Sequence, residues 1–529
     1  MPRLAPVLAL ALGAALGGAC KKQPQQKPDA HGRDEVAATP NPVVQQGLPA
    51  PHKLSREPDA AMHVATPAAT LAAAAAYVPQ VPALAEFGAQ ILSTQGPSEW
   101  ATTVGAQLDG QRAWTGANVA GEDILHFALQ RGGVVKVQVA MAKFARRGEF
   151  GAVVLPPAAL AVKDGDLVRA TTPGPERLAW IDTIANTLTI ASTLEGLATG
   201  RELAGTYGKQ PLWFTMTETR GQPLFGSFPY GRVEATGAGL HSLDISAAAR
   251  KGQKLPVLRD IAPGPIGGPL TSKSIAAGVS TRWTGYKEAV REVTHQLQVM
   301  VDRAGFAGRM MLDPIADQAT RVLKTWNGRV LLAVGPAKHL RLGLGADDPF
   351  AAHRGLLTLL RDVTENLQLA RMFVSNIPNA SLKKVGDNPD IWMLTATGLG
   401  NQLPPALRTL LDDGRLRVAF NGSAHAGGVL VVIGPRADSE LKAWLGEAAN
   451  AASGKDGMKD LLHATTAASP EAVAAVLQAL EQNATDKLLT AVLALTADRA
   501  PTQLVMRKVG ERYEITVRGP EATPGKPRR

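Results

Sequence analysis

The segment Trp326-Asn327-Gly328-Arg329-Val330-Leu331-Leu332-Ala333-Val334-Gly335-Pro336 carries the clearest structural signals in the chain. Asn-Gly is the pair that two-residue hairpin turns favour, because both residues tolerate a positive φ. The apolar run after it is rich in valine and leucine, which suits a buried strand. Gly-Pro then predicts that the strand ends and that a helix follows.

A similar pattern recurs further along the chain. Phe420-Asn421-Gly422 is followed, after a six-residue insertion, by Val429-Leu430-Val431-Val432-Ile433 and Gly434-Pro435, and Asp438 or Ser439 can cap a helix after them. Weaker relatives occur at 180–203 and in the matching stretches 233–240 and 394–400, where an alternating strand ends in glycines. These echoes predict an internally duplicated strand–turn–strand–helix unit.

Helices and a closing hairpin are predicted from hydrophobic periodicity. From Tyr286 to Ala304 the apolar residues recur every three or four positions and predict one buried helix face; they are Val290, Val293, Leu297, Met300 and Ala304. The series Leu356, Leu360, Val363 and Leu367 predicts a second helix, and Ser469-Pro470-Glu471 predicts the start of a third. Residues 503–507 and 513–517 predict a hairpin around Gly510.

This mixture predicts an α+β fold of tandem modules, with largely antiparallel sheet and packed helices after a disordered N-terminal tether. The Gly/Pro-rich stretch 262–269 is the best linker candidate. We divide the chain into a signal peptide (1–19), a lipidated cysteine with a disordered Pro/Gln-rich tether (20–67), a first α+β module (68–265), a second containing the repeat (266–518) and a disordered basic tail (519–529). The arrangement resembles large, uncharacterised bacterial envelope proteins with repeated strand–helix modules.

The N-terminus has the features of an export signal. Arg3 precedes an apolar stretch that is too short for a permanent transmembrane helix, which needs roughly 20 apolar residues. The stretch ends in Leu16-Gly17-Gly18-Ala19-Cys20, which resembles the lipobox of bacterial lipoproteins, although Gly17 stands where leucine is usual. Cys20 is the only cysteine in 529 residues, so it has no disulfide partner within the chain.

The resemblance implies cleavage before Cys20 and attachment of acyl chains such as palmitate to that residue. Two or more acyl chains hold a protein stably on a membrane. Lys21 and Lys22 follow the cysteine in place of aspartate, which in the sorting rule of the family favours the outer membrane. We therefore expect a cell-envelope protein whose first partner is the membrane, through its lipid anchor.

The formal net charge is +10 for the whole chain and +9 without residues 1–19, which carry only Arg3. A basic balance attracts anionic lipid or polysaccharide. Lys and Arg are spread along the chain and form no stripe, so we expect no nucleic-acid partner.

Catalytic motifs are weak. Ser381-Leu382-Lys383-Lys384 and Ser439-Glu440-Leu441-Lys442 match the Ser-x-x-Lys of penicillin-interacting enzymes, but the companion Lys-Thr-Gly is missing. The histidines are scattered, and no metal-binding, phosphate-binding or dinucleotide motif occurs, so we assign no cofactor, no metal site and no catalytic residue. Asn421, Gly422, Ser423 and His425 lie in a glycine-rich stretch that we interpret as an inserted hairpin loop and a possible surface for binding.

These observations favour a non-catalytic, membrane-anchored binding or scaffold protein of the envelope, with a protein or polysaccharide partner. An envelope hydrolase acting on peptidoglycan or another polymer is the alternative, and a purely structural spacer is the third reading. Two equivalent pockets in the two modules would favour binding, whereas one deep cleft with a perturbed carboxylate or histidine would favour hydrolysis.

Overall fold

The computed structural model describes residues 58–519, apart from 75–80, 120–121, 145, 148–151, 156–158, 165–166, 174–175, 208–210, 218–229, 250–260, 267–274, 336–337, 373–376, 388–389, 401–402, 425, 452–458 and 483–484. Cys20 and the tail beyond residue 519 lie outside the described residues. The described chain is α+β, and its strands pair in antiparallel fashion. It forms two units, one from residues up to 226 with 234–239 and one from 227–233 with 240 onward.

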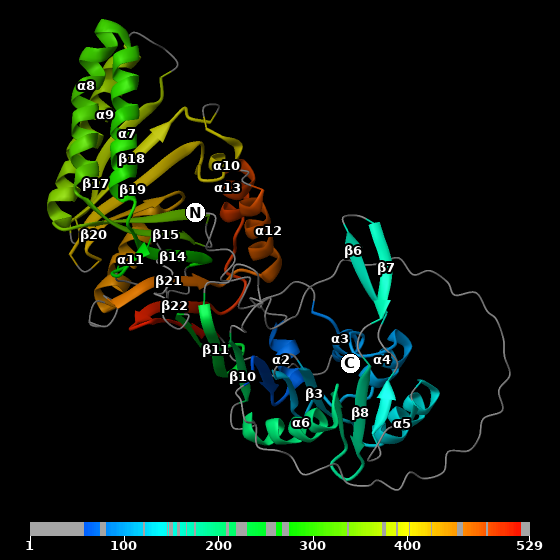
Figure 1. The fold of residues 1–529 in the computed structure, drawn as a ribbon. Coiled ribbons are helices and arrows are strands. Elements are labelled where there is room, and N and C mark those ends of the chain that lie inside the picture. Colours follow the sequence, from blue (N-terminus) through cyan, green and yellow to red (C-terminus); the bar gives the residue numbers. More distant parts are fainter. Residues whose placement is uncertain are drawn as a thin grey trace. The chain divides into compact units, whose positions relative to one another are not determined.

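The first unit has strands in the spatial order β10-β1-β2-β3-β9-β8-β5-β4 (Figure 1). The strands are β1 (Ala60–Val64), β2 (Trp114–Val119), β3 (Glu122–Ala128), β4 (Arg146–Arg147), β5 (Val153–Leu155), β8 (Arg177–Asp182), β9 (Thr187–Ala191) and β10 (Leu212–Thr217), with a separate hairpin of β6 (Ala159–Asp164) and β7 (Leu167–Pro173). Helices are α2 (Pro67–Ala74), α3 (Leu84–Leu92), α4 (Ser98–Gly105), α5 (Gly133–Phe144) and α6 (Leu194–Tyr207).

Each face of this sheet has its own core. Trp100 and Val104 of α4 and Val137 of α5 pack with Phe127 and Ile190 of the strands. On the other face, α6 contributes Leu197 and Leu203 to a cluster with Ile124, Trp180 and Trp213. Alternation of side chains along each strand sends neighbouring residues into these two cores.

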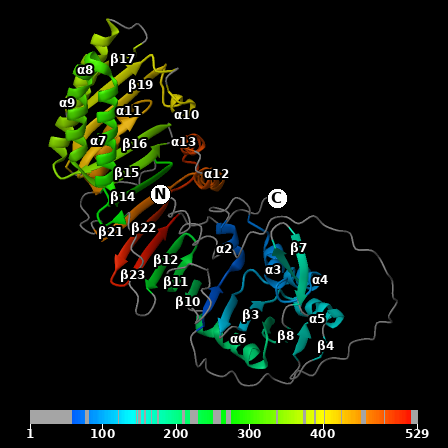
Figure 2. The ribbon, with the colours of Figure 1, turned by 45° about the horizontal axis from the view of Figure 1, so that its top comes forward.

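The second unit holds a longer sheet in the order β12-β23-β22-β21-β14-β15-β16-β20-β19-β18-β17, and Figure 2 shows the pairing of its strands. The strands are β12 (Ser242–Ala249), β14 (Ala277–Trp283), β15 (Trp326–Gly335), β16 (His339–Ala346), β17 (Asn379–Asp387), β18 (Asp390–Thr397), β19 (Arg415–Ser423), β20 (Gly428–Ile433), β21 (Asp460–Thr466), β22 (Thr502–Val509) and β23 (Arg512–Arg518), and the short β13 (Ile261–Ala262) pairs with β14. Strand β11 spans Tyr230–Gly239.

Two helices cover opposite faces of this sheet. Helix α11 (Ala437–Ala451) packs its Leu441 and Trp444 on Leu430 and Val432, whereas α9 (Pro349–Arg371) covers the face that carries Phe420. The remaining helices are α7 (Tyr286–Arg303), α8 (Gly305–Lys324), α10 (Pro405–Arg408), α12 (Pro470–Glu481) and α13 (Thr485–Leu493).

Several sequence predictions are confirmed. Helices α7, α9 and α12 lie where periodicity and capping place them, and Ser469 caps α12 by accepting from the Ala472 amide. Strands β22 and β23 form the closing hairpin, with Gly510 at φ +57°. Helix α11 follows Gly434-Pro435, and α6 follows β8 and β9.

Other predictions need correction. Residues 60–64 were assigned to the tether, but they form β1, which pairs with β2 and β10 in the interior of the first sheet. A helix was expected after Gly335, but strand β16 follows and pairs back onto β15. Asn327-Gly328 lies inside β15 at a register irregularity, not in a hairpin turn. The Gly/Pro-rich residues 262–266 lie within the second unit.

Candidate functional site

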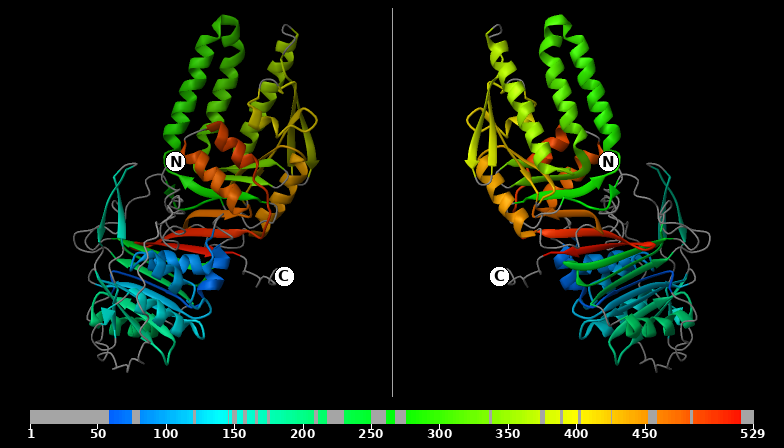
Figure 3. Two further views of the ribbon diagram at one scale, coloured as in Figure 1. Left: turned by 90° about the vertical axis from the view of Figure 1, so that its right-hand side faces the viewer. Right: turned by 90° about the vertical axis from the view of Figure 1, so that its left-hand side faces the viewer.

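A helical hairpin formed by α7 and α8 carries several exposed apolar side chains in the described part of the second unit. Gly305, at φ +69°, makes the turn between the helices, a conformation that favours glycine. Figure 3 shows the two green helices standing away from the sheet. An α-helix rises 1.5 Å per residue, so an 18-residue helix such as α7 extends about 27 Å.

The face of α7 that periodicity predicts to be buried is largely open. Within α7 only Val301 is buried, while Val293 and Met300 are exposed. The physical reason is that α7 packs against α8 and meets the sheet near its base, so its apolar stripe has one helix to cover it. The prediction of the helix is confirmed, and the prediction of its buried face is wrong.

Exposed apolar side chains gather around the turn. Phe306 is 84% exposed, Met310 68% and Met300 63%. Together with Met311 and Leu312, which are also exposed, we call these five residues the apolar tip. Single exposed apolar residues are common on protein surfaces, but several of them close to one turn favour an interaction surface. Methionine suits such a surface because its flexible thioether adapts to different partners.

Charge at the apolar tip is internally compensated. Arg309 is the only charged residue from 304 to 312. Its Nη2 lies 3.0 Å from a carboxylate oxygen of Asp302, and its Nε lies 3.9 Å from one of Asp313. The first pair joins α7 to α8 across the turn, so it also holds the two helix ends together.

The base of the hairpin is packed by aromatic rings. Tyr286 at the start of α7 meets Trp326 edge-on, with ring centroids 5.7 Å apart, and Trp283 lies 6.0 Å from Trp326. Gly328 lies at φ +88°, and a Cβ there would fall 2.6 Å from the Trp283 carbonyl oxygen. Lower on α8, Gln318 donates to the Gly355 carbonyl of α9 over 3.1 Å. The hairpin is thus fixed at the sheet and open at its tip.

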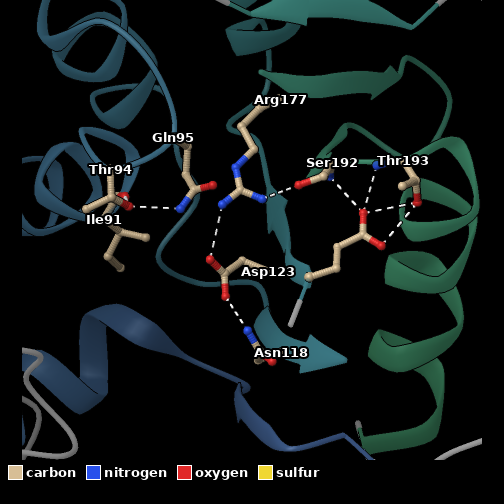
Figure 4. Close-up of polar contacts among 9 residues, drawn as sticks. Ile91, Thr94, Gln95, Asn118, Asp123, Arg177, Ser192 and Thr193 are labelled. Carbon is tan, nitrogen blue, oxygen red and sulfur yellow. Dashed lines mark hydrogen bonds and ion pairs between the residues drawn. The ribbon is translucent and has the colours of Figure 1, made fainter. Parts of the chain in front are cut away.

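The first unit contains a cluster of polar side chains around the buried Arg177, whose partner Asp123 is partly exposed (Figure 4). The Arg177 guanidinium donates to the Ser192 hydroxyl and, over 3.2 Å, to Asp123. Asp123 also accepts from Asn118 over 2.7 Å. Arg177 Nε is buried without a hydrogen-bond partner among the described residues, as is Oε1 of Gln95, whose side chain points toward Arg177 in the close-up. A half-satisfied guanidinium favours an oxygen acceptor.

Beside this cluster, Glu122 binds the segment that leads into helix α6, while the Thr193 hydroxyl caps the helix itself by accepting from the Gly196 amide over 2.9 Å. One carboxylate oxygen of Glu122 accepts from the Ser192 amide over 2.8 Å and from the Thr193 amide over 2.7 Å, and the Thr193 hydroxyl donates to both oxygens. A carboxylate at a helix N-terminus satisfies free amides and interacts favourably with the helix dipole. The N-terminus of α6 is therefore occupied by the chain's own anion.

A row of histidine and threonine side chains crosses the first sheet on the α6 face. His63 Nδ1 and Thr115 Oγ1 are 2.9 Å apart, as are His126 Nδ1 and Thr189 Oγ1. Burial lowers the pKa of both imidazoles, for His126 to about 4, with Arg201 and Arg112 adding to the shift. Both rings are therefore neutral at pH 7. In register the row runs Trp213, His63, Thr115, His126, Thr189, Trp180.

In the second unit, α11 closes over a buried arginine. Arg341 of β16 has no exposed side-chain surface, and its Nη2 lies 3.1 Å from a Glu440 oxygen and its Nη1 3.6 Å from one of Glu447. Burial lowers the pKa of the adjacent His339, although Glu440 opposes that shift. Glu440, Trp444 and Glu447 are spaced by four and three residues, which places all three on one face of α11. The sequence shows this spacing, but it does not show that Arg341 is the buried residue that they contact.

A second histidine–carboxylate contact lies on β21. His463 Nε2 is 2.6 Å from Asp460, whose other oxygen is 2.5 Å from Arg507 Nε. Asp460 is buried, and it is the one side chain to which His463 is hydrogen-bonded among the described residues. This pair could orient a general base, but no hydroxyl or thiol is bonded to the ring.

The residues of the predicted binding loop lie at the end of β19. Asn421 is buried and donates to the Asp390 carbonyl over 2.6 Å, and Ser423 is buried and accepts from the Ala426 amide. A Cβ on Gly422 would fall 2.6 Å from the Pro349 carbonyl oxygen of α9. The contacts that the structure describes for Asn421, Gly422 and Ser423 are therefore with other residues of the same unit. His425 lies outside the described residues.

The two Ser-x-x-Lys matches do not form dyads. On strand β17, Ser381 and Lys384 are three residues apart and therefore point to opposite faces, and Lys384 pairs with Asp390 over 3.1 Å. Ser439 lies in the first turn of α11 and donates to the Arg436 carbonyl. The helix begins at Ala437, before both Asp438 and Ser439, so the prediction that one of them caps it is wrong.

In the part of the chain that the structure describes, no three His, Cys, Asp or Glu side chains gather as metal ligands, and no helix has the length and apolarity to cross a membrane. No protein-family model, curated protein or solved structure matches the chain.

Proposed function

We propose that the protein is a lipid-anchored binding or scaffold protein of the bacterial cell envelope. The observation that carries the binding role is the apolar tip, where Phe306, Met300 and Met310 present exposed apolar side chains on a rigidly based hairpin. These side chains are exposed to water, so their apolar surface does not add to the stability of the isolated chain. Their exposure therefore supports a role in binding a partner. The anchor is proposed from the lipobox-like Leu16-Gly17-Gly18-Ala19-Cys20.

The outer membrane is the proposed location, from Lys21 and Lys22, with an envelope protein or polysaccharide as a further partner and no nucleic acid. We also propose that the chain is built of tandem α+β modules and that the second of them contains a duplicated strand–turn–strand–helix unit. What supports this is a shared order: the hairpin β15–β16 is followed directly by α9, and the hairpin β19–β20 by α11.

The proposal is tested by intact-mass analysis of the protein purified from native membranes, beside a Cys20→Ala variant. We expect the wild-type chain to begin at residue 20 with added acyl mass, and the variant to be released or unprocessed. A wild-type chain that carries no acyl group would contradict the anchor. Fractionation of inner and outer membranes tests the location separately.

An envelope hydrolase is the second candidate, and the Asp460–His463 pair is the observation in its favour. A hydrolase would release soluble fragments from purified peptidoglycan, and His463→Gln would abolish the release while Lys508→Gln, an exposed change elsewhere, would not. The binding proposal expects no release from either protein.

A further inference from the structure

We propose that the apolar tip docks into the surface of a lipid bilayer, as a second membrane contact beside the anchor. This inference rests on the proposed envelope location, but it concerns different residues, in a part of the chain far from Cys20 in sequence. The tip residues Met300, Phe306, Met310, Met311 and Leu312 would enter the boundary between headgroups and acyl chains, where apolar side chains are removed from water.

The position of the exposed side chains favours a soft, deformable partner. The apolar-tip residues lie on both sides of the turn that joins α7 to α8, at the end of the hairpin that stands away from the sheet (Figure 3). Phe306 follows the turn glycine directly, and Met310 lies one helical turn later. A protein partner would need a matching hollow with a polar rim, whereas lipid adapts to any convex apolar surface.

The charges favour uncharged lipid surfaces. Arg309 is neutralised by Asp302 and Asp313, and the other charged residue beside the turn, Arg303, can reach the headgroup phosphates while its stem stays apolar. The formal charges of Arg303, Arg309, Asp302 and Asp313 sum to zero. Docking should therefore depend on apolar burial and not on anionic lipid, although the chain as a whole is basic.

The length of chain before the fold leaves room for a second contact. Thirty-nine residues separate Cys20 from Ala60, the first residue of β1. Covalent geometry lets such a segment span at most about 140 Å. The anchor alone therefore fixes the folded chain only within that radius, and the apolar tip would set which surface faces the bilayer.

The test uses the mature chain with Cys20→Ser, so that no acyl group can bind lipid. Sedimentation with phosphatidylcholine vesicles is measured for this protein, for a tip variant (Phe306→Asp with Met310→Asp), and for a matched control (Ile184→Asp with Val509→Asp). Ile184 and Val509 are exposed apolar residues that do not belong to the α7–α8 hairpin, so the control carries the same change of charge. We expect the tip variant to bind at least about tenfold more weakly than the other two.

A site-specific readout follows from the cysteine content. Because Cys20 is the only cysteine, Phe306→Cys in the Cys20→Ser chain accepts a single environment-sensitive fluorophore. We expect vesicles to shift the emission of this label to the blue, and to leave a label at Val509→Cys, an exposed position on β22 of the same unit, unchanged. Binding to phosphatidylcholine should persist at 1 M salt, where the Debye length falls to about 3 Å.

Three results would overturn the proposal. The first is no sedimentation with phosphatidylcholine, and the second is equal binding by the tip variant, with circular dichroism showing that all proteins are folded. The third is concentration-dependent dimerisation without lipid that the tip variant loses, which would assign the apolar tip to a second copy of the chain. Intact-mass analysis of Cys20 is unaffected by any of these, so failure of the anchor and failure of the tip are distinguishable.

Discussion

The guanidinium of Arg341 lies against the indole of Trp444, with its Cζ atom 5.6 Å from the ring centroid. Trp444 is itself buried, and Glu440 and Glu447 lie four residues before and three residues after it on α11. The helix therefore supplies the ring and both carboxylates to one buried cation. Removing one partner of a buried ion pair leaves an uncompensated charge. A position of α11 that separated its carboxylates from Arg341 would therefore be disfavoured, so this contact favours one position of the helix on the sheet.

Replacement of Glu440 should destabilise the second unit. We expect Glu440→Ala to lower the free energy of unfolding by about 3 kcal/mol, because Arg341 then keeps its charge in a buried site with one carboxylate fewer. Arg341→Met should cost less, since an apolar side chain suits the site and Glu440 can reach water. Urea unfolding of the mature chain measures both. Lys442→Ala, an exposed change on the same helix, is the control, and an unshifted Glu440→Ala midpoint would contradict the expectation.

Loss of the Glu122 contacts at the start of α6 should affect the first unit. Glu122→Ala removes the acceptor for the Ser192 and Thr193 amides, so we expect a loss of about 1–2 kcal/mol in unfolding free energy. Glu195→Ala is the matched control, because Glu195 is an exposed carboxylate in the first turn of the same helix. Hydrogen exchange of the α6 amides localises the effect; equal protection in the two variants would show that Glu122 does not stabilise the start of the helix.

Acidification should destabilise the chain through His126. Its folded pKa of about 4 lies below the unfolded value of about 6.5, so the unfolded chain binds more protons between these values. The contribution of this residue is therefore complete above pH 6.5 and is lost as the pH falls toward 4, amounting to about 3 kcal/mol. His126→Gln should flatten the dependence of unfolding free energy on pH. Parallel curves for wild type and variant would refute this, and NMR titration of the ring gives the pKa directly.

Local signals were predictable from the sequence, and contacts between distant segments were not. The apolar period located α7 and the hairpin of β22 and β23, because helix pitch and turn glycines act within a few residues. The period shows that α7 has an apolar side, but it cannot show what covers that side. Met300, the one apolar-tip residue within that period, was therefore assigned to a buried face, although it is 63% exposed.

Burial of polar residues was the other feature that the sequence did not reveal. Arg341 lies in strand β16, where the sequence predicted a helix, and it is covered by α11, about 100 residues later. Strand β1 is a five-residue segment in a Pro- and Ala-rich region, and its pairing depends on β2 and β10. Only partners far along the chain give these residues their environment.

Gly422 offers a test of whether the β19 segment is fixed by packing. A Cβ at this position would fall 2.6 Å from the Pro349 carbonyl oxygen and 2.7 Å from His353 Cβ, both at the start of α9. The backbone oxygen cannot move without shifting the helix, so we expect Gly422→Ala to lower the unfolding free energy by about 2 kcal/mol. Gly446→Ala is the matched control: a Cβ at Gly446 meets nothing within 4 Å, and alanine within α11 should raise stability by up to about 1 kcal/mol. Opposite signs in urea unfolding would place Gly422 at a closely packed strand–helix contact. If Gly422→Ala left the unfolding free energy unchanged, α9 would have to lie further from β19. The segment around Gly422 could then be an exposed loop that is available for binding.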